Sequence, residues 1–235
     1  MPAEQPSRLQ RAQRMLVRLS QLTQQKGGHR LALVIFAAKA KLVCPLTHDY
    51  DHFREVVLKY DLKHLDPSIW PDKNDVSGTR IGTGLLQAVE AHDQGDSETQ
   101  SILLLSDGDD PVNEDDWRFI GVPDATHRAI PIHCVGIGDE LEQTIPAAKF
   151  NSQPVKTKLN EEPLQDIAER TGGVYIHAGR SEIDADAIFR LTLSSGGLRD
   201  KGVDRLPVYR QQFAWFLTPA FVLLLGAIAI RGKLR

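Results

Sequence analysis

The stretch that decides the fold is Ser101-Ile-Leu-Leu-Leu-Ser-Asp-Gly-Asp-Asp110, in which an apolar run from Ile102 to Leu105 stops at a polar turn. Short apolar runs bounded by turn signals are typical of strands buried on both faces in parallel sheets. Such sheets bind ligands at the carboxyl ends of their strands, so Asp107 is expected at the functional edge. Carboxylates there favour a hard cation such as Mg²⁺. A solvated turn that caps the next helix is the alternative, and this stretch leaves both interpretations open.

The composition allows one sizeable domain and an appendage within 235 residues. Charged residues make up 25% of the chain and the net charge is −3, so bulk electrostatics gives no indication of nucleic-acid binding. Cys44 and Cys134 lie in or beside apolar runs and have no zinc-site spacing. They are interpreted as two buried thiols, and a disulfide between them stays open.

Residues 213–230 form an uncharged apolar segment, followed by the basic tail Arg231-Gly-Lys-Leu-Arg235. As a helix the segment spans about 27 Å, close to the hydrocarbon thickness of a bilayer. A buried helix of a soluble domain is the alternative, but such helices are rarely apolar on all sides. The sequence therefore predicts a transmembrane anchor.

The rest of the chain alternates apolar runs with segments of helical periodicity. Strands are predicted at residues 31–36, 41–44, 102–105, 130–137 and 174–177, and helices at residues 7–25, 49–57, 81–89, 162–170 and 181–193. Pro45 is expected to stop the second strand, and residues 143–157 are a loop or a β-excursion. Asp49 and Ser181 are expected to cap the helices that begin at those positions. This alternation predicts an α/β fold, a doubly wound and mostly parallel sheet with helices on both faces.

Several local signals refine this picture. Ser7-Arg-Leu-Gln10 has the form of a capping box, and the arginines that follow are interpreted as a solvated helix face (Arg8, Arg11, Arg14 and Arg18). The turn Ser77–Gly84 offers hydroxyls and backbone N–H groups to an ion, or it uses a threonine as an N-cap. Gly136-Ile-Gly138 lacks the third glycine of a dinucleotide site. His133 and His177 are interpreted as structural.

The ordered set of motifs resembles the von Willebrand factor A domain, and is most similar to the membrane-anchored bacterial proteins of the aerotolerance (Bat) type. The motifs that carry the resemblance are Ser7-Arg-Leu9, Leu33-Val-Ile-Phe-Ala37, Pro45-Leu-Thr-His-Asp49, Gly78-Thr-Arg-Ile-Gly82, Leu105-Ser-Asp-Gly108, Val135-Gly-Ile-Gly138 and Thr171-Gly-Gly-Val-Tyr175. The resemblance implies a metal-ion-dependent adhesion site with Thr79 and Asp107 as ligands of Mg²⁺, or of Mn²⁺ or Ca²⁺.

The first ligand motif of that family, Asp-x-Ser-x-Ser after a central strand, does not occur in the sequence. The domain is therefore expected to be N-terminally truncated, lacking its first strand, and its cation site is expected to be weak or absent. The expected organisation is a von Willebrand factor A-like domain at 1–197, a juxtamembrane linker at 198–212, the transmembrane helix at 213–230 and the basic tail at 231–235.

The resemblance implies a non-enzymatic protein-binding module in a complex of the bacterial inner membrane. Its domain is expected on the periplasmic side, with other membrane or periplasmic proteins, some from the same operon, as partners and no nucleic acid. The first alternative is a Mg²⁺-dependent phosphoryl-transfer enzyme that uses Asp107, Asp109 and Asp110. The second is a metal-free structural anchor.

Overall fold

The structure is a computed structural model that describes residues 6–26, 29–60, 67–69, 79–92, 100–109, 116–138, 143–150, 153–179 and 184–192. The chain divides into two compact units, Met1–Leu198 and Arg199–Arg235, and every described residue belongs to the first. The predicted transmembrane segment at 213–230 lies outside the described residues. Among the helices that are described, none has the length and apolarity needed to cross a membrane.

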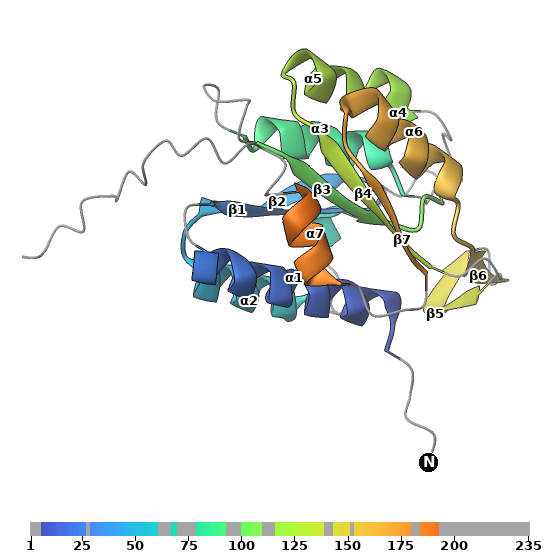
Figure 1. Cartoon of the computed structure of the whole chain (residues 1–235). Coiled ribbons are helices and arrows are strands. Elements are labelled where there is room, and N and C mark those ends of the chain that lie inside the picture. Colours follow the sequence, from blue (N-terminus) through green and yellow to red (C-terminus); the bar gives the residue numbers. More distant parts are fainter. Residues whose placement is uncertain are drawn as a thin grey trace, which may run out of the picture. The chain divides into compact units, whose positions relative to one another are not determined.

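A parallel three-stranded sheet forms the centre of the first unit (Figure 1). Its strand order is β3-β4-β7, with bounds β3 (Ile102–Ser106), β4 (Ile132–Ile137) and β7 (Tyr175–Gly179). Ile102 pairs with Ile132 and Ser106 with Gly136, while Gly136 in turn pairs with His177. The carboxyl ends of all three strands therefore meet at one edge, as the sequence predicts for a parallel sheet.

Helices cover both faces of this sheet (Figure 1). One layer contains α3 (Ile81–Glu90), α4 (Asp116–Phe119), α5 (Val122–His127) and α6 (Glu161–Thr171), and the other contains α1 (Arg8–Lys26), α2 (Tyr50–Lys59) and α7 (Ala185–Thr192).

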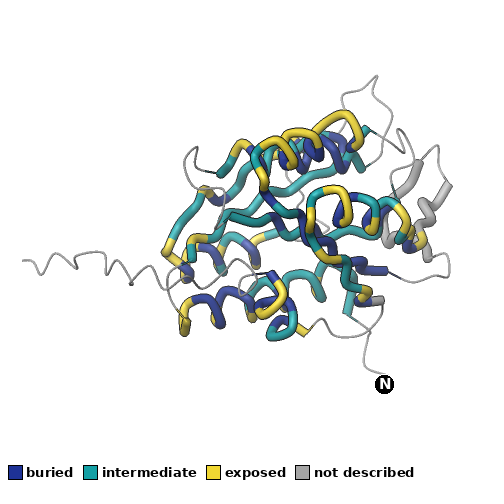
Figure 2. Tube along the Cα trace, turned by 45° about the horizontal axis from the view of Figure 1, so that its top comes forward, coloured by how far each residue is buried: buried dark blue, intermediate teal, exposed yellow. Residues whose placement is uncertain are grey.

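Successive residues of β3 pack alternately against the two helix layers. Ile102 and Leu104 join the core cluster of α3 to α6, whereas Leu103 and Leu105 pack against α1 and α7. This alternation follows from the two-residue period of a strand. Figure 2 shows the buried residues on the sides of the helices that face the strands. The prediction of an α/β fold wound on both faces is confirmed.

The predicted sheet is not continuous in the described part of the chain. Strands β1 (Leu31–Phe36) and β2 (Ala40–Thr47) form a separate antiparallel pair, and no described strand joins β1 to β3. All six residues of β1 are only partly buried, although an apolar run of this kind is typical of a strand with two neighbours. Helix α1 packs against both pieces, through Leu16 on β1 and Met15 on the β3 side.

The expectation that Pro45 stops the second strand is wrong, because β2 continues to Thr47. Cys44 pairs with Leu33 and Thr47 with Leu31, so two residues of β2 lie opposite the single residue between those partners. This bulge accommodates Pro45, since a proline nitrogen has no hydrogen to donate and the ladder is already interrupted there.

Two helix starts confirm the local sequence signals. Ser7 and Gln10 exchange hydrogen bonds, from Ser7 N to Gln10 Oε1 (2.9 Å) and from Gln10 N to Ser7 Oγ (3.2 Å). Asp49 Oδ1 accepts a hydrogen bond from His52 N (2.9 Å) at the start of α2. Both signals depend only on residues three positions apart, which is why the sequence reveals them.

The remaining elements are the short helix η1 (Pro67–Ile69) and a hairpin of β5 (Gln143–Phe150) and β6 (Gln153–Thr157). The hairpin is the β-excursion that the sequence left open. Helix α7 begins after Asp184, whose Oδ1 accepts hydrogen bonds from Asp186 N (3.0 Å) and Ala187 N (3.1 Å). The predicted cap of this helix, Ser181, lies outside the described residues.

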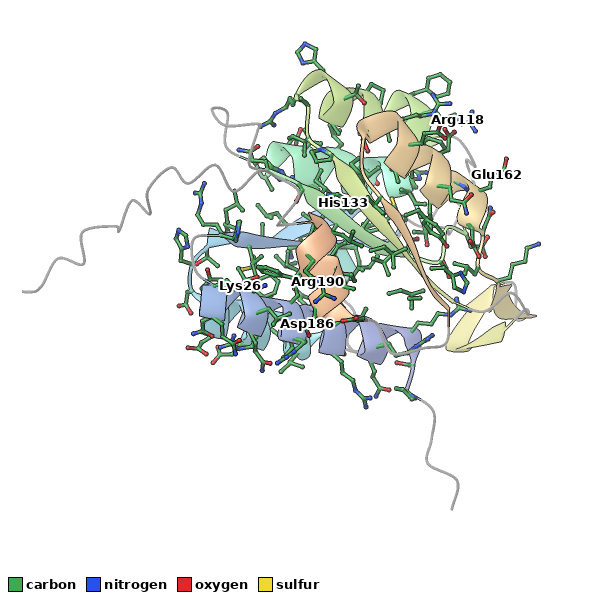
Figure 3. The ribbon with its side chains drawn as sticks, viewed as in Figure 1. Lys26, Arg118, His133, Glu162, Asp186 and Arg190 are labelled. Atoms are coloured by element: carbon green, nitrogen blue, oxygen red, sulfur yellow. The ribbon has the colours of Figure 1, made fainter. Side chains whose placement is uncertain are left out.

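Strand β4 is buried along its whole length. His133, labelled on β4 in Figure 3, is only 4% exposed, and its Nδ1 accepts a hydrogen bond from Val174 N (3.2 Å). Burial lowers the pKa of this imidazole, which fits the acceptor role of an uncharged ring. Its interpretation as a structural residue is confirmed.

Candidate functional site

Asp107 follows β3 directly and accepts hydrogen bonds at both carboxylate oxygens and at its main-chain oxygen. Its Oδ2 accepts from Arg8 Nη1 (2.7 Å), its Oδ1 accepts from Asp109 N (3.3 Å), and its main-chain oxygen accepts from Asn160 N (2.8 Å). The Asp107 side chain is 22% exposed and the Arg8 side chain 24%. The Asp107 carboxylate at the predicted edge is therefore fixed by hydrogen bonds, remains partly exposed to solvent and forms an ion pair with Arg8.

Three element ends converge on Asp107. The carboxyl end of β3 supplies Asp107, the N-terminus of α1 supplies Arg8, and Asn160 is the N-cap of α6. Figure 1 shows the starts of α1 and α6 on the side where β3 ends, and Figure 3 labels Glu162 in the first turn of α6. The ends of parallel strands and the starts of the following helices share one edge, so this convergence follows from the winding.

The turn after Asp107 requires glycine. Gly108 has φ +70°, and a Cβ at this position would lie 2.0 Å from the Asn160 oxygen. Its amide donates to Ser106 Oγ (3.0 Å). The close approach of the β3–α4 turn to the start of α6 therefore depends on the absence of a side chain.

The Gly136-x-Gly138 motif serves packing in this structure. A Cβ at Gly136 would lie 2.5 Å from the Tyr175 hydroxyl oxygen, and one at Gly138 would lie 3.1 Å from Leu159 Cβ. The two glycines let the end of β4 pass close to β7 and to the segment before α6. Close packing is therefore sufficient to explain a motif that was weak evidence for nucleotide binding.

Thr79 lies beside the end of β1, because the amide of the next residue, Arg80, donates to the Ala37 oxygen (2.8 Å). A threonine N-cap does not begin α3. The N-cap residue is Arg80, which makes no side-chain capping bond, and the amide of Gly82 donates instead to Asp116 Oδ1 (3.2 Å). The capping alternative for this turn was wrong, since the cap comes from another helix.

Asp116 opens α4 and contacts the start of α3, a contact that the sequence does not predict. Burial raises the pKa of its carboxyl group, while the Gly82 hydrogen bond and the Arg80 charge act in the opposite direction. The carboxylate also faces the positive end of α3, where an anion is favourable. Its distance in sequence from Gly82, 34 positions, left no local signal for this contact.

Arg8 is the second residue that sequence reasoning misplaced. The sequence indicates a solvated helix face for Arg8, Arg11, Arg14 and Arg18, yet the Arg8 guanidinium binds Asp107 and the Arg8 side chain is largely covered. One signal was present in the sequence. Arg8 is the first residue of α1, and a positive charge is unfavourable at a helix N-terminus, so a compensating anion was to be expected nearby.

The described donors around Asp107 do not fit a divalent cation as they stand. No group of three or more His, Cys, Asp or Glu side chains that could hold a metal occurs among the described residues. Mg²⁺ and Ca²⁺ need several oxygen ligands, whereas both carboxylate oxygens of Asp107 already accept hydrogen bonds, one from a cation. Of the predicted ligands, Asp107 directly follows β3 and Thr79 lies beside the end of β1. Their metal-binding role stays a prediction.

The cysteines do not supply a reactive group to this edge. Cys44 and Cys134 are free and buried, so no disulfide joins them. Burial raises the pKa of the Cys44 thiol, and it raises the pKa of Cys134 to about 12. Since the thiolate is the nucleophilic form, both side chains are inert at neutral pH.

Residues 1–109 match the family model described as the von Willebrand factor type A domain. This part of the chain is therefore similar to the von Willebrand factor type A domain, the family that the ordered motifs indicate.

Two solved structures share this fold. One is described as a conserved hypothetical protein BatB from Bacteroides thetaiotaomicron, with 24% identity, TM-score 0.61, and coverage of 78% of this chain and 86% of that one. The other is an aerotolerance-related membrane protein from Bacteroides fragilis, with 23% identity, TM-score 0.61, and coverage of 80% of this chain and 90% of that one. At these identities the likeness establishes a common fold.

A curated relative is an uncharacterized protein of Borreliella burgdorferi, 25% identical over 213 residues. The match covers 86% of this chain and 56% of that relative. The chain thus spans little more than half the length of the relative.

Proposed function

We propose that the chain is a non-enzymatic, membrane-anchored protein-binding module that uses the edge around Asp107 to hold its partner. The observation that carries this proposal is the fixed, partly exposed Arg8–Asp107 pair at the carboxyl edge of a domain similar to the von Willebrand factor type A domain. Hydrogen bonds from the amides of Asn160 and Asp109 fix Asp107 in the absence of a partner. Preorganisation of this kind reduces the free energy lost on binding.

The proposed setting is a complex of the bacterial inner membrane. One solved neighbour is described as an aerotolerance-related membrane protein, and the apolar residues 213–230 suit an anchor. The basic residues Arg231, Lys233 and Arg235 favour a cytoplasmic carboxyl terminus, which would put the domain on the periplasmic side. The proposed partners are other membrane or periplasmic proteins, including products of the same operon.

Site-specific photo-crosslinking in bacterial membranes tests the binding edge. A photoreactive residue at Lys158, which is exposed and close to Asn160, would report contacts of the proposed edge. The same residue at Ala129, exposed near the start of β4, is the matched control on the opposite edge. We expect a discrete adduct with a membrane or periplasmic protein from position 158 that Asp107→Ala removes, and none from position 129.

Equal adducts from both positions, or none from either, would contradict the binding edge and would favour the structural-anchor alternative. Protease accessibility in spheroplasts tests the setting independently. Cleavage of the domain from outside the inner membrane is expected, and protection of the domain in intact spheroplasts would overturn the periplasmic assignment.

The phosphoryl-transfer alternative needs a nucleophile near Asp107. The two cysteines are buried and protonated, and the Asp107 carboxylate is bound by Arg8. A phosphatase assay with Asp107→Asn as the control separates the two functions. Activity that depends on Asp107 would favour the enzyme over the binding module.

A further inference from the structure

Arg8 occupies a position that its own helix disfavours. The capping box of Ser7 and Gln10 fixes the start of α1, so Arg8 is the first helical residue. The first turn contains no acidic residue. A guanidinium at the positive end of a helix is destabilising unless an anion compensates for it. The compensating anion in the structure is Asp107, 99 positions away in the sequence.

The contact has the geometry of a charge-assisted hydrogen bond. Arg8 Nη1 lies 2.7 Å from Asp107 Oδ2, within the short range typical of such pairs. Both side chains are about three-quarters covered, so water screens the pair less than it would a fully exposed one. The second oxygen, Oδ1, is engaged by the Asp109 amide. The Asp107 carboxylate is thus neutralised from within the domain.

A divalent cation at Asp107 would have to compete with this arrangement. It would need a carboxylate oxygen at about 2.0–2.6 Å, and one of the two oxygens already carries a guanidinium. Two cations that share one carboxylate repel each other, and the repulsion is strong where solvent is partly excluded. Arg8 and a metal ion are therefore alternative partners of Asp107.

We propose that Arg8 is the resident counter-cation of Asp107, and that it suppresses divalent-cation binding at this edge. In the described state the edge presents an Arg–Asp pair, and a metal ion binds Asp107 only after Arg8 moves away. This inference deepens the proposed function, because it assigns the control of cation access at the same binding edge. It concerns the affinity for the metal ion alone, so its test does not depend on finding a partner.

The test measures Mn²⁺ binding to the full detergent-solubilised chain by the loss of the free-ion electron paramagnetic resonance signal. Arg8→Gln removes the charge and leaves the capping box intact. Arg18→Gln is the matched control, because Arg18 lies on the same helix and pairs with Asp186 at 3.6 Å, away from Asp107. Arg8→Gln combined with Asp107→Asn shows whether any gain depends on Asp107.

We expect Arg8→Gln to bind Mn²⁺ about tenfold more tightly than the unmodified chain, the ratio that loss of one charged hydrogen bond produces. Arg18→Gln should match the unmodified chain, and the double variant should lose the gain. Equal affinity of the unmodified chain and a folded Arg8→Gln would overturn the proposal, as would a gain that persists in the double variant.

Arg8→Lys keeps the test decisive if Arg8→Gln does not fold. Lysine retains the charge but lacks the planar fork that matches a carboxylate. We expect an affinity for Mn²⁺ above that of the unmodified chain and below that of an uncharged residue. An affinity equal to that of the unmodified chain would contradict the role of the guanidinium.

Discussion

The Asp116 carboxylate caps a helix to which it does not belong. Its Oδ1 accepts a hydrogen bond from the amide of Gly82 (3.2 Å), in the first turn of α3, while Asp116 itself begins α4. The N-cap residue of α3, Arg80, provides no such acceptor. One carboxylate therefore satisfies an α3 backbone donor and links the start of α3 to α4.

Replacing Asp116 with alanine should destabilise the domain by about 1 kcal/mol, the usual effect of losing a helix cap. Urea unfolding monitored by circular dichroism measures the change. The control is Glu55→Ala, because Glu55 is exposed in the interior of α2 and such surface changes stay within about 0.5 kcal/mol. Equal effects of the two substitutions would show that the Asp116 contact contributes nothing specific.

Alanine at Gly108 should be much more destabilising than alanine at Gly172. Both residues have positive φ, +70° and +72°, so both variants bear the strain of a left-handed alanine, about 1 kcal/mol. Only at Gly108 would the new Cβ also collide with the Asn160 oxygen, since nothing lies within 4 Å at Gly172. The free energies of unfolding in urea measure the difference, and similar losses for the two variants would contradict the close approach of the β3–α4 turn to α6.

His133 should make the domain less stable in mild acid. Burial lowers the pKa of its folded form below 6.5, so the unfolded chain binds more protons than the folded chain between that lowered value and 6.5. Stability therefore falls as the pH drops from 8 through this window. Urea midpoints at pH 8 and pH 5.5 measure the loss.

His133→Gln should reduce that loss because glutamine does not titrate. Burial also lowers the pKa of His29, so His29→Gln measures that residue's share of the same effect. An unchanged pH dependence in His133→Gln would show that His133 does not contribute.

The amides of β1 should exchange with solvent faster than those of β4. Strand β4 is paired on both sides and fully buried, whereas β1 pairs with β2 and its residues are partly exposed. Hydrogen exchange followed by mass spectrometry compares the two strands, because exchange follows the stability of local structure. Protection of β1 equal to that of β4 would contradict the weaker burial and the one-sided pairing of β1 among the described residues.

Signals within a few residues made much of the fold predictable. The apolar run that ends at Leu105 identified β3, and the Asp49 side chain identified the start of α2. The family motifs pointed to the von Willebrand factor type A domain, and residues 1–109 match the model of that family. The end of β2 was mispredicted at Pro45, because a proline can lie within a strand where there is a bulge. The bulge depends on the pairing with β1, which the local sequence does not show.

The sequence by itself determined the strands of the central sheet, most of the helices around it and the position of Asp107 at a strand end, because periodicity and caps act between neighbouring residues. Only the tertiary structure decided that Arg8 neutralises Asp107, that Asp116 caps α3 and that β1 stands apart from β3. Those outcomes depend on which side chains and strand edges meet after the layers pack. Arg8 and Asp107 lie 99 positions apart and Gly82 and Asp116 lie 34 positions apart, so the local sequence does not identify the partner in either pair.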